Sequence, residues 1–151
     1  MRTILFILGF LLISGLCFSQ ESTDSEGVKK ACMNYLEGFY EGDILKLKAA
    51  IKPALFKFGY WKNKETDTYA AQGNMTYQQA LDYAKGVAEK KNFAKKEAPK
   101  KVDVLDISNH IAAAKITAWW GVDYVLLSKT DGIWMIEQVI WEGPLEKTHL
   151  N

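Results

Sequence analysis

The stretch that decides the fold runs from residue 102 to residue 141 and reads VDVLDISNHIAAAKITAWWGVDYVLLSKTDGIWMIEQVIW. Four apolar or alternating runs within it predict strands over 102–107, 111–120, 122–129 and 133–141. Short turns at Ser108-Asn109, near Trp120-Gly121 and at Asp131-Gly132 separate them. Asp-Gly between two such runs is a strong hairpin signal, because a type I′ turn needs φ > 0 at both central residues. The stretch therefore predicts a four-stranded antiparallel meander.

The turns also predict a register. A two-residue loop at Asp131-Gly132 sets Val125 opposite Gln138, and the same loop length at the preceding turn sets Ala118 opposite Asp123. Since side chains alternate across a sheet, these pairs lie on one face, which is apolar and rich in small residues. That face comprises Ala112, Ala114, Ile116, Ala118, Asp123, Val125, Leu127, Trp134, Ile136, Gln138 and Ile140. The opposite face comprises Lys115, Thr117, Trp119, Tyr124, Leu126, Met135, Val139 and Trp141.

The N-terminus predicts export. Arg2 precedes the uncharged apolar run ILFILGFLLISGL, and small residues flank a cleavage site before Gln20. This is the pattern of a secretory signal peptide, and the run is short for a transmembrane span. We therefore expect residues 1–19 to be removed. Residues 20–151 then form one domain, periplasmic or extracellular, with no membrane attachment.

Composition excludes several functional classes. The chain has 19 Lys and Arg against 18 Asp and Glu, and loss of Arg2 with the signal peptide makes the two counts equal. A neutral domain lacks the basic face that nucleic acid requires. Cys32 is alone once Cys17 has left, and it lies on the apolar stripe of a predicted helix, where a small buried residue is usual. We expect no metal site and no cofactor, since nitrogen and sulfur ligands are too few.

Upstream of the meander, the sequence predicts three helices and one strand. The first helix opens with the capping box of Thr23 and Glu26 and stops at Gly42, and the second spans Ile44–Ile51. The third opens with the capping box of Thr76 and Gln79 and runs to about residue 91. Residues 55–61 alternate like an edge strand, and residues 63–74 read as a loop. Helices followed by a meander predict an α+β fold with helices stacked on one face of a curved sheet.

Two segments carry a family resemblance. Residues 35–55 read YLEGFYEGDILKLKAAIKPAL and residues 123–141 read DYVLLSKTDGIWMIEQVIW. Together they resemble the putative lumazine-binding group of the NTF2-like superfamily, to which SnoaL-like and ketosteroid-isomerase-like domains also belong. The resemblance implies a cone of three N-terminal helices on a curved antiparallel sheet, a pocket between them, and a homodimer formed through the outer sheet face. Lys52 stands where the family often has a histidine before the proline.

The resemblance also suggests site residues. Ketosteroid isomerase and polyketide cyclases set an acidic residue and a tyrosine in an apolar cone, where burial raises the pKa of the carboxyl group. The counterparts here are Asp123 and Tyr35 as catalytic candidates, with Gln138 as a hydrogen-bond donor. Alternatively, Asp123 accepts backbone N–H bonds and Tyr35 is a core residue. The aromatic walls of a ligand site are predicted at Phe39, Tyr60, Trp61 and Trp134. A dimer interface is predicted at Trp119, Tyr124, Met135 and Trp141, and the alternative is that these residues pack under a terminal segment.

Three functions fit these features. The first is an exported domain that binds a small aromatic or apolar ligand without strong catalysis. The second is an isomerase or cyclase in which Asp123 transfers a proton. The third is an interaction module that uses the outer sheet face. The sequence lacks a His–carboxylate pair and a nucleophile constellation, and this favours the first.

Overall fold

The computed structural model describes residues 23–150, so the predicted signal segment, residues 1–19, lies outside the described residues. The described helices are one over residues 23–41, α2 (Ile44–Ala50) and α3 (Tyr77–Lys90). The described strands are β1 (Ile51–Asn63), β2 (Thr68–Met75), β3 (Lys101–Ile107), β4 (Ile111–Ala118), β5 (Gly121–Thr130) and β6 (Ile133–Gly143), and a short 3-10 helix, η1 (Lys147–Leu150), follows them.

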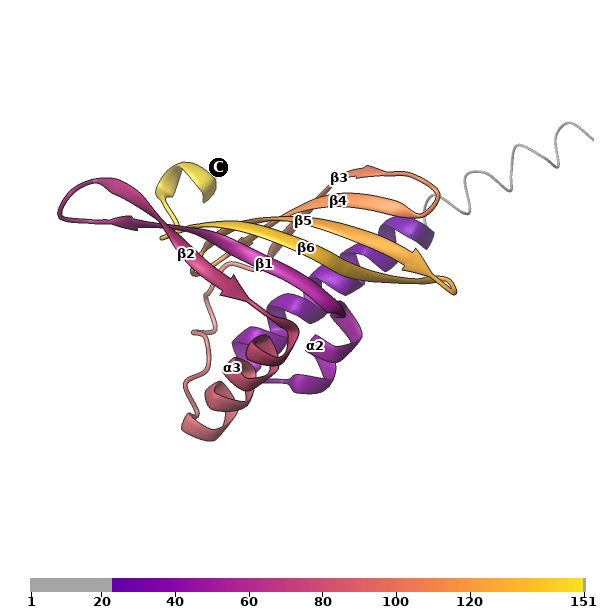
Figure 1. Cartoon of the computed structure of the whole chain (residues 1–151), viewed down its shortest axis with the longest axis horizontal. Coiled ribbons are helices and arrows are strands. Elements are labelled where there is room, and N and C mark those ends of the chain that lie inside the picture. Colours follow the sequence, from indigo (N-terminus) through magenta and orange to yellow (C-terminus); the bar gives the residue numbers. More distant parts are fainter. Residues whose placement is uncertain (1–22, 151) are drawn as a thin grey trace, which may run out of the picture.

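The helices lie on one face of a single curved sheet, and η1 lies on the other (Figure 1). The described strands are ordered β2-β1-β6-β5-β4-β3. The prediction of an α+β fold with three helices and a curved sheet is therefore confirmed. The prediction of an antiparallel sheet throughout was wrong for one pair, because β1 runs parallel to β6. This arises because β1 is inserted between β2 and β6 and does not continue the meander.

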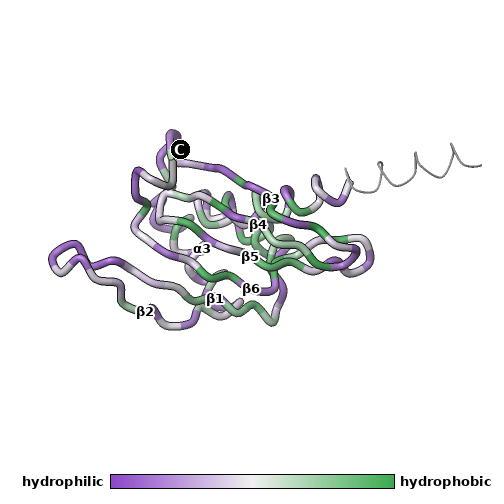
Figure 2. The backbone as a smooth tube through the Cα atoms, turned by 90° about the horizontal axis from the view of Figure 1, so that it is seen from above, coloured by the Kyte–Doolittle hydropathy of each residue, from purple (hydrophilic) through white to green (hydrophobic). Residues whose placement is uncertain are grey.

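The prediction of a loop over residues 63–74 was wrong. Residues 68–75 form β2, which pairs antiparallel with β1 and makes β2, not β1, the edge strand. Nearly all of β2 is exposed, so its sequence carries no apolar period that would indicate a strand. Figure 2 shows how hydrophilic the tip of the β1–β2 hairpin is beside the alternating central strands.

The register of the β4–β5 hairpin differs from the prediction by two residues. Ala118 pairs with Gly121 and Ile116 pairs with Asp123, so the turn residues are Trp119 and Trp120. Because side chains repeat every two residues along a strand, a shift of two leaves each residue on its predicted face. The inward direction of Asp123 was therefore predicted correctly from an incorrect turn.

The register of the β5–β6 hairpin was correct only as far as Ile136. Lys129 pairs with Trp134 and Leu127 with Ile136, but Leu126 then pairs with Gln138. The unpaired residue between these positions makes a β-bulge, and one extra residue reverses the faces of everything that follows. Residues after the bulge therefore contradict the prediction: Val139 and Trp141 turn inward, whereas Gln138 and Ile140 turn outward and are exposed.

The N-terminal helix packs its predicted apolar stripe onto the inner face of the sheet. Its buried members are Val28, Ala31, Cys32, Tyr35, Leu36 and Phe39. Cys32 is the buried small residue that the sequence predicts, and burial raises the pKa of its thiol to about 12. None of the helices within residues 23–150 is long and apolar enough to span a membrane.

One polar cluster joins the start of this helix to the β5–β6 hairpin. The Asp24 carboxylate accepts hydrogen bonds from Lys129 Nζ at 2.8 Å and from Trp134 Nε1 at 3.0 Å. Gly27 leaves room for the indole, since a Cβ there would lie 2.6 Å from Trp134 Cδ1. Trp134 is thus an anchor between helix and sheet.

Candidate functional site

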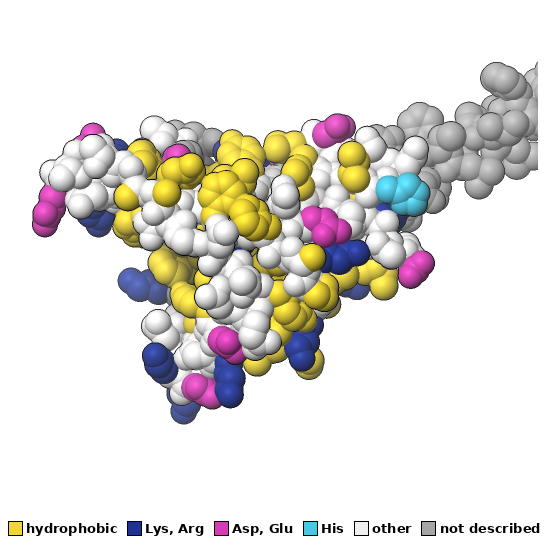
Figure 3. All heavy atoms as spheres, in the orientation of Figure 1, with side chains coloured by type: hydrophobic (Ala, Val, Ile, Leu, Met, Phe, Trp, Pro, Cys, Tyr) yellow, Lys and Arg dark blue, Asp and Glu magenta, His cyan; other side chains and the backbone are white. Residues whose placement is uncertain are grey.

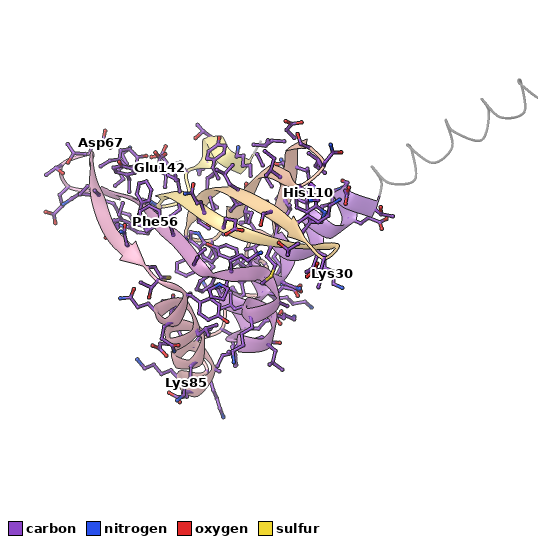
Figure 4. All side chains as sticks on the ribbon, turned by 45° about the vertical axis from the view of Figure 1, so that its right-hand side comes forward. Lys30, Phe56, Asp67, Lys85, His110 and Glu142 are labelled. Atoms are coloured by element: carbon purple, nitrogen blue, oxygen red, sulfur yellow. The ribbon has the colours of Figure 1, made fainter. Side chains whose placement is uncertain are left out.

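A cavity of about 170 Å³ lies where the N-terminal helix and α3 face the inner side of the sheet. It is almost entirely apolar, and one lysine contributes its charged group. The lining residues are Phe39, Lys57, Trp61, Met75, Tyr83, Trp119, Trp120 and Trp141. An adjoining hollow of about 400 Å³ shares Phe39, Tyr83 and Trp119 with it and continues toward residues 92–98. Figure 4 shows side chains crowded between sheet and helices, with Lys85 of α3 at the far end.

Two local features shape the sheet side of this cavity. The bulge in β6 turns Trp141 inward, and its neighbour on β1 is Gly59. A Cβ at Gly59 would lie 2.5 Å from Trp141 Cγ, so the glycine leaves space for the indole. Trp61, two residues along β1, meets Trp141 with ring centroids 6.2 Å apart. The two indoles form one wall.

The polar centre of the site lies directly behind this wall. Asp123 is fully buried, and its carboxylate accepts hydrogen bonds from Tyr35 Oη at 2.6 Å and from Trp120 Nε1 at 2.7 Å. Lys57 Nζ lies 2.8 Å from Tyr35 Oη and 3.4 Å from Asp123 Oδ2. Asp123 is not among the lining residues, so Lys57 and Trp120 separate it from the cavity.

Burial dominates the electrostatics of this cluster. Removal from water disfavours any charged form, so it lowers the pKa of Lys57, and the charge of Asp123 only partly opposes this. Burial also raises the pKa of Tyr35 well above its ordinary value, and the neighbouring Asp123 carboxylate raises it further. Tyr35 therefore remains a neutral hydrogen-bond donor at physiological pH. The amine of Lys57 loses its proton more readily than a solvated lysine does.

Aromatic rings fix the positions of these polar groups. Tyr35 and Phe39 meet edge to face at 5.0 Å, and Phe39 and Trp120 at 5.9 Å. Lys57 Nζ lies 5.4 Å from the ring centroid of Trp141 and 5.5 Å from that of Tyr35, within cation–π range. The lysine head is thus surrounded by ring faces.

A second tyrosine holds the β4–β5 turn that carries Trp120. The hydroxyl of Tyr40 accepts a hydrogen bond from the Trp119 backbone N–H at 2.8 Å and donates one to the Pro99 carbonyl oxygen at 2.6 Å. Burial raises the pKa of Tyr40 to about 12. The turn is therefore tied both to the N-terminal helix and to the segment that leads into β3.

The structure brings together some of the predicted site residues. Tyr35 and Asp123 share a hydrogen bond, while Phe39 and Trp61 line the cavity. Trp119 and Trp141, predicted at a dimer interface, also line the cavity.

The remaining candidates lie elsewhere. Gln138 is exposed on the outer face, and Tyr60 shares that face with Tyr124. Met135 is half-buried on the same face, while Trp134 packs against the start of the N-terminal helix. The β6 bulge accounts for the errors at Gln138 and Trp141.

Sequence reasoning missed Lys57, Trp120, Met75 and Tyr83. For Lys57 a signal existed, because in the alternating stretch Leu55–Trp61 it lies on the same face as Leu55 and Gly59. A lysine on the buried face of a strand rarely lacks a partner, so its position indicated a polar site. For Met75 there was none, because β2 was not predicted. Tyr83 lies on the predicted helix α3, but it is about half exposed and is not one of the buried residues of that helix. Within residues 23–150, no three His, Cys, Asp or Glu side chains lie close enough together to hold a metal ion.

Solved structures with the same fold are distant in sequence. An NTF2-like protein of unknown function from Silicibacter pomeroyi aligns with a TM-score of 0.60 at 12% identity, covering 80% of this chain and 96% of that one. One from Methylobacillus flagellatus aligns with a TM-score of 0.60 at 22% identity, covering 79% and 90%. An NTF2-like protein of unknown function from Shewanella baltica aligns with a TM-score of 0.56 at 19% identity, covering 78% of this chain and 91% of that one. These likenesses establish an NTF2-like fold.

Comparison with curated proteins found no match. Comparison with protein families is decisive, because one family matches nearly the whole described chain, from residue 23 to residue 142. That span includes both quoted segments, the bulge in β6 and every residue that lines the cavity. The chain belongs to the family described as "Putative lumazine-binding", and it has the NTF2-like fold.

Proposed function

We propose that this protein is an exported binding domain that holds a small, flat aromatic or apolar ligand in the cavity beside Lys57. The proposal is supported by one observation, the composition of the cavity lining. Apart from the Lys57 amine, the lining consists of aromatic rings and one methionine. Ligand pockets typically combine apolar walls with few polar groups, and those for drug-sized ligands measure about 300–1,000 Å³. A cavity of about 170 Å³ fits a ligand of one or two rings, and the adjoining hollow accommodates a substituent.

Binding without proton transfer is the function that the geometry favours. The isomerase or cyclase alternative requires Asp123 to contact the substrate, yet this carboxylate is fully buried and lies outside the lining. A substrate would first have to displace Lys57 or Trp120. The group that meets a ligand directly is the Lys57 amine, which can donate a hydrogen bond to a carbonyl or an anionic oxygen.

Tryptophan fluorescence tests the proposal directly, since four of the lining residues are tryptophans. We expect one-ring and two-ring aromatic compounds, lumazine among them, to quench the emission saturably. Trp141→Ala removes one wall and should weaken binding by about tenfold or more, the loss expected for one stacked ring. Tyr124→Ala, on the exposed outer face, is the matched control and should bind as the wild type does. Equal affinities in the two variants would overturn the assignment of the site.

Export is the second part of the proposal, and the N-terminal sequence supports it. Arg2, the apolar run and the small residues before Gln20 form a signal-peptide pattern. N-terminal sequencing of the protein isolated from its own host tests this. We expect the mature chain to begin at Gln20, and a chain that retains residues 1–19 would contradict export by this route.

We also propose that two copies associate through the outer sheet face. Its exposed apolar side chains form one patch across β1, β6 and β5, defined by Phe56, Tyr60, Tyr124, Leu126 and Ile140. Figure 3 shows hydrophobic side chains gathered on the sheet above the helices, and Figure 4 places Phe56 and Glu142 on this side, away from Lys85. Exposed, contiguous apolar patches of this kind commonly mark sites of protein–protein interaction. The interaction-module function rests on the same patch.

A further inference from the structure

The Lys57 amine is the one basic group among the described residues that line the cavity. Its side chain is 8% exposed, and Nζ lies among the rings of Tyr35, Trp120 and Trp141 at 5.4–5.9 Å from their centroids. A lysine held with its amine at the wall of an apolar cavity is costly to bury as a cation. Such a lysine is typically retained for its chemistry or for its charge.

A purely structural role as the counter-ion of Asp123 explains the geometry poorly. The carboxylate already receives two short hydrogen bonds from neutral donors, at 2.6 Å from Tyr35 and 2.7 Å from Trp120. Lys57 Nζ is farther away, at 3.4 Å, and its closer partner is the Tyr35 hydroxyl oxygen at 2.8 Å. Asp123 therefore keeps its hydrogen bonds when Lys57 is neutral.

Other lysines on the same molecule have the opposite environment. Lys62 contacts Asp67 at 2.8 Å and Glu146 at 3.0 Å, and these hydrogen bonds raise its pKa. Lys46 contacts Glu37 and Glu41, with the same effect. Burial lowers the pKa of Lys57 instead. Because only the neutral amine is a nucleophile, Lys57 is the more reactive of these three lysines near neutral pH.

We propose that Lys57 Nζ forms a reversible imine with an aldehyde or ketone group on the aromatic ligand. This inference rests on the proposed binding function and names the class of ligand. The ring of the ligand lies against the indoles of Trp61 and Trp141, and its carbonyl carbon meets the amine at the cavity wall. Enclosure by these rings limits access of water and so slows hydrolysis of the product.

The reaction balances without an external oxidant or reductant. The nitrogen lone pair forms a C–N bond to the carbonyl carbon, and the C=O π electrons move to oxygen. The nitrogen gives up two protons in turn. The first converts the alkoxide to a hydroxyl group and the second converts the hydroxyl group to water, and solvent carries both because Asp123 lies outside the lining. The C–O bond breaks, water leaves, and the C=N bond remains. Hydrolysis reverses each step and releases the ligand.

Reductive trapping tests the proposal on the folded protein. The protein is incubated with 2-naphthaldehyde and sodium cyanoborohydride near neutral pH, digested, and mapped by mass spectrometry. The neutral fraction of an amine rises about tenfold for each unit by which its pKa falls, so we expect Lys57 to be labelled at least that much more than Lys62 or Lys46. Labelling spread evenly over exposed lysines would overturn the proposal, and this readout needs no variant.

Two variants sharpen the result. Lys57→Arg keeps the charge but cannot form an imine, and it should lose the dominant label. Lys115→Arg, on the outer face, should be labelled at Lys57 as the wild type is. Undiminished total labelling in Lys57→Arg would contradict the inference.

A ligand without the carbonyl separates this inference from the proposed function. Naphthalene-2-methanol has the same ring system but forms no imine, and its binding is followed by tryptophan fluorescence. Binding of the alcohol, with no trapping of the aldehyde at Lys57, overturns the imine and leaves the binding function standing. Failure of both compounds to bind overturns both proposals. Selective trapping together with binding of the alcohol supports both.

Discussion

At the scale of single residues, the site depends on a buried group of four side chains: Tyr35, Lys57, Trp120 and Asp123. The pairing of Tyr35 with Asp123 was predictable, because the helical stripe points one inward and the strand alternation points the other inward. Lys57 was not identified, because the alternation of residues 55–61 was not assigned to faces, and Tyr60 and Trp61 were both predicted to line the ligand site. In the structure Lys57 is buried, whereas Phe56 and Tyr60 are exposed.

The first residue-scale prediction concerns the buried ion pair. Asp123→Asn removes the negative charge beside Lys57 and leaves its ammonium form with the neutral Tyr35 hydroxyl, at 2.8 Å, in an apolar setting. Loss of one member of a buried pair costs about 3–5 kcal/mol, and we expect a loss near that range in urea denaturation. Lys57→Met on the Asp123→Asn background should restore part of it. If the double variant were less stable than Asp123→Asn alone, the coupling between the two residues would not be the cause.

The second residue-scale prediction concerns alkaline pH. The pKa of Tyr35 is raised in the folded state, so the tyrosine ionises first in the unfolded chain, at about pH 10. The unfolded state then holds fewer protons than the folded state, and the free energy of unfolding falls as pH rises above that value. Tyr35→Phe should make this fall shallower in denaturation curves between pH 9 and pH 11. Tyr40→Phe should act in the same direction, since the pKa of Tyr40 is about 12.

At the scale of secondary-structure elements, two register errors had different consequences. The β4–β5 turn lies at Trp119-Trp120 and not at Trp120-Gly121, yet no residue changed face. The bulge after Ile136 shifted the pairing by one residue and reversed the faces of Gln138 and Trp141. Turn signals predict register only until the ladder is interrupted, and no feature of a single sequence marks where one extra residue will be accommodated.

The element-scale prediction concerns the Asp131-Gly132 turn. Both residues have positive φ, 51° and 79°, as the type I′ prediction requires. Gly132→Val places a β-branched residue in this left-handed conformation, at a cost of about 1–3 kcal/mol. Gly73→Val is the matched control, because Gly73 lies on the exposed edge strand β2 with open space around its Cβ position. Thermal unfolding of the two variants makes the comparison, and an equal loss in both would argue against strain at the turn.

At the scale of the whole molecule, the sheet divides the protein into two surfaces. The inner face carries the core and the cavity, and the outer face carries the apolar patch that includes Tyr124 and Leu126. Helical periodicity, strand alternation and two sequence segments were enough to predict this division and the family. Ligand identity was beyond prediction, because the lining residues come from separate elements, among them β2, that no local pattern brings together.

The whole-molecule prediction concerns self-association. Leu126→Glu introduces a charge within the outer patch and should convert a dimer to a monomer in analytical ultracentrifugation, because burying an unpaired charge is costly. Leu45→Glu is the control: Leu45 is more exposed, at 76%, but lies on α2, away from the patch. If the wild-type protein sediments as a monomer at all concentrations, the proposed dimer is wrong.

The parallel pairing of β1 with β6 has a consequence for how the molecule is made. β1 is the first strand of the described residues, but its ladder partner β6 is the last strand. The wall formed by Trp61 and Trp141, and with it the setting of Lys57, therefore assembles only after all of the intervening strands have been synthesised. Contacts so distant in sequence close slowly, because the intervening chain must be ordered first. On the proposed export route the chain crosses a membrane unfolded and gains from this delay, since the binding site cannot form before β6 has been synthesised.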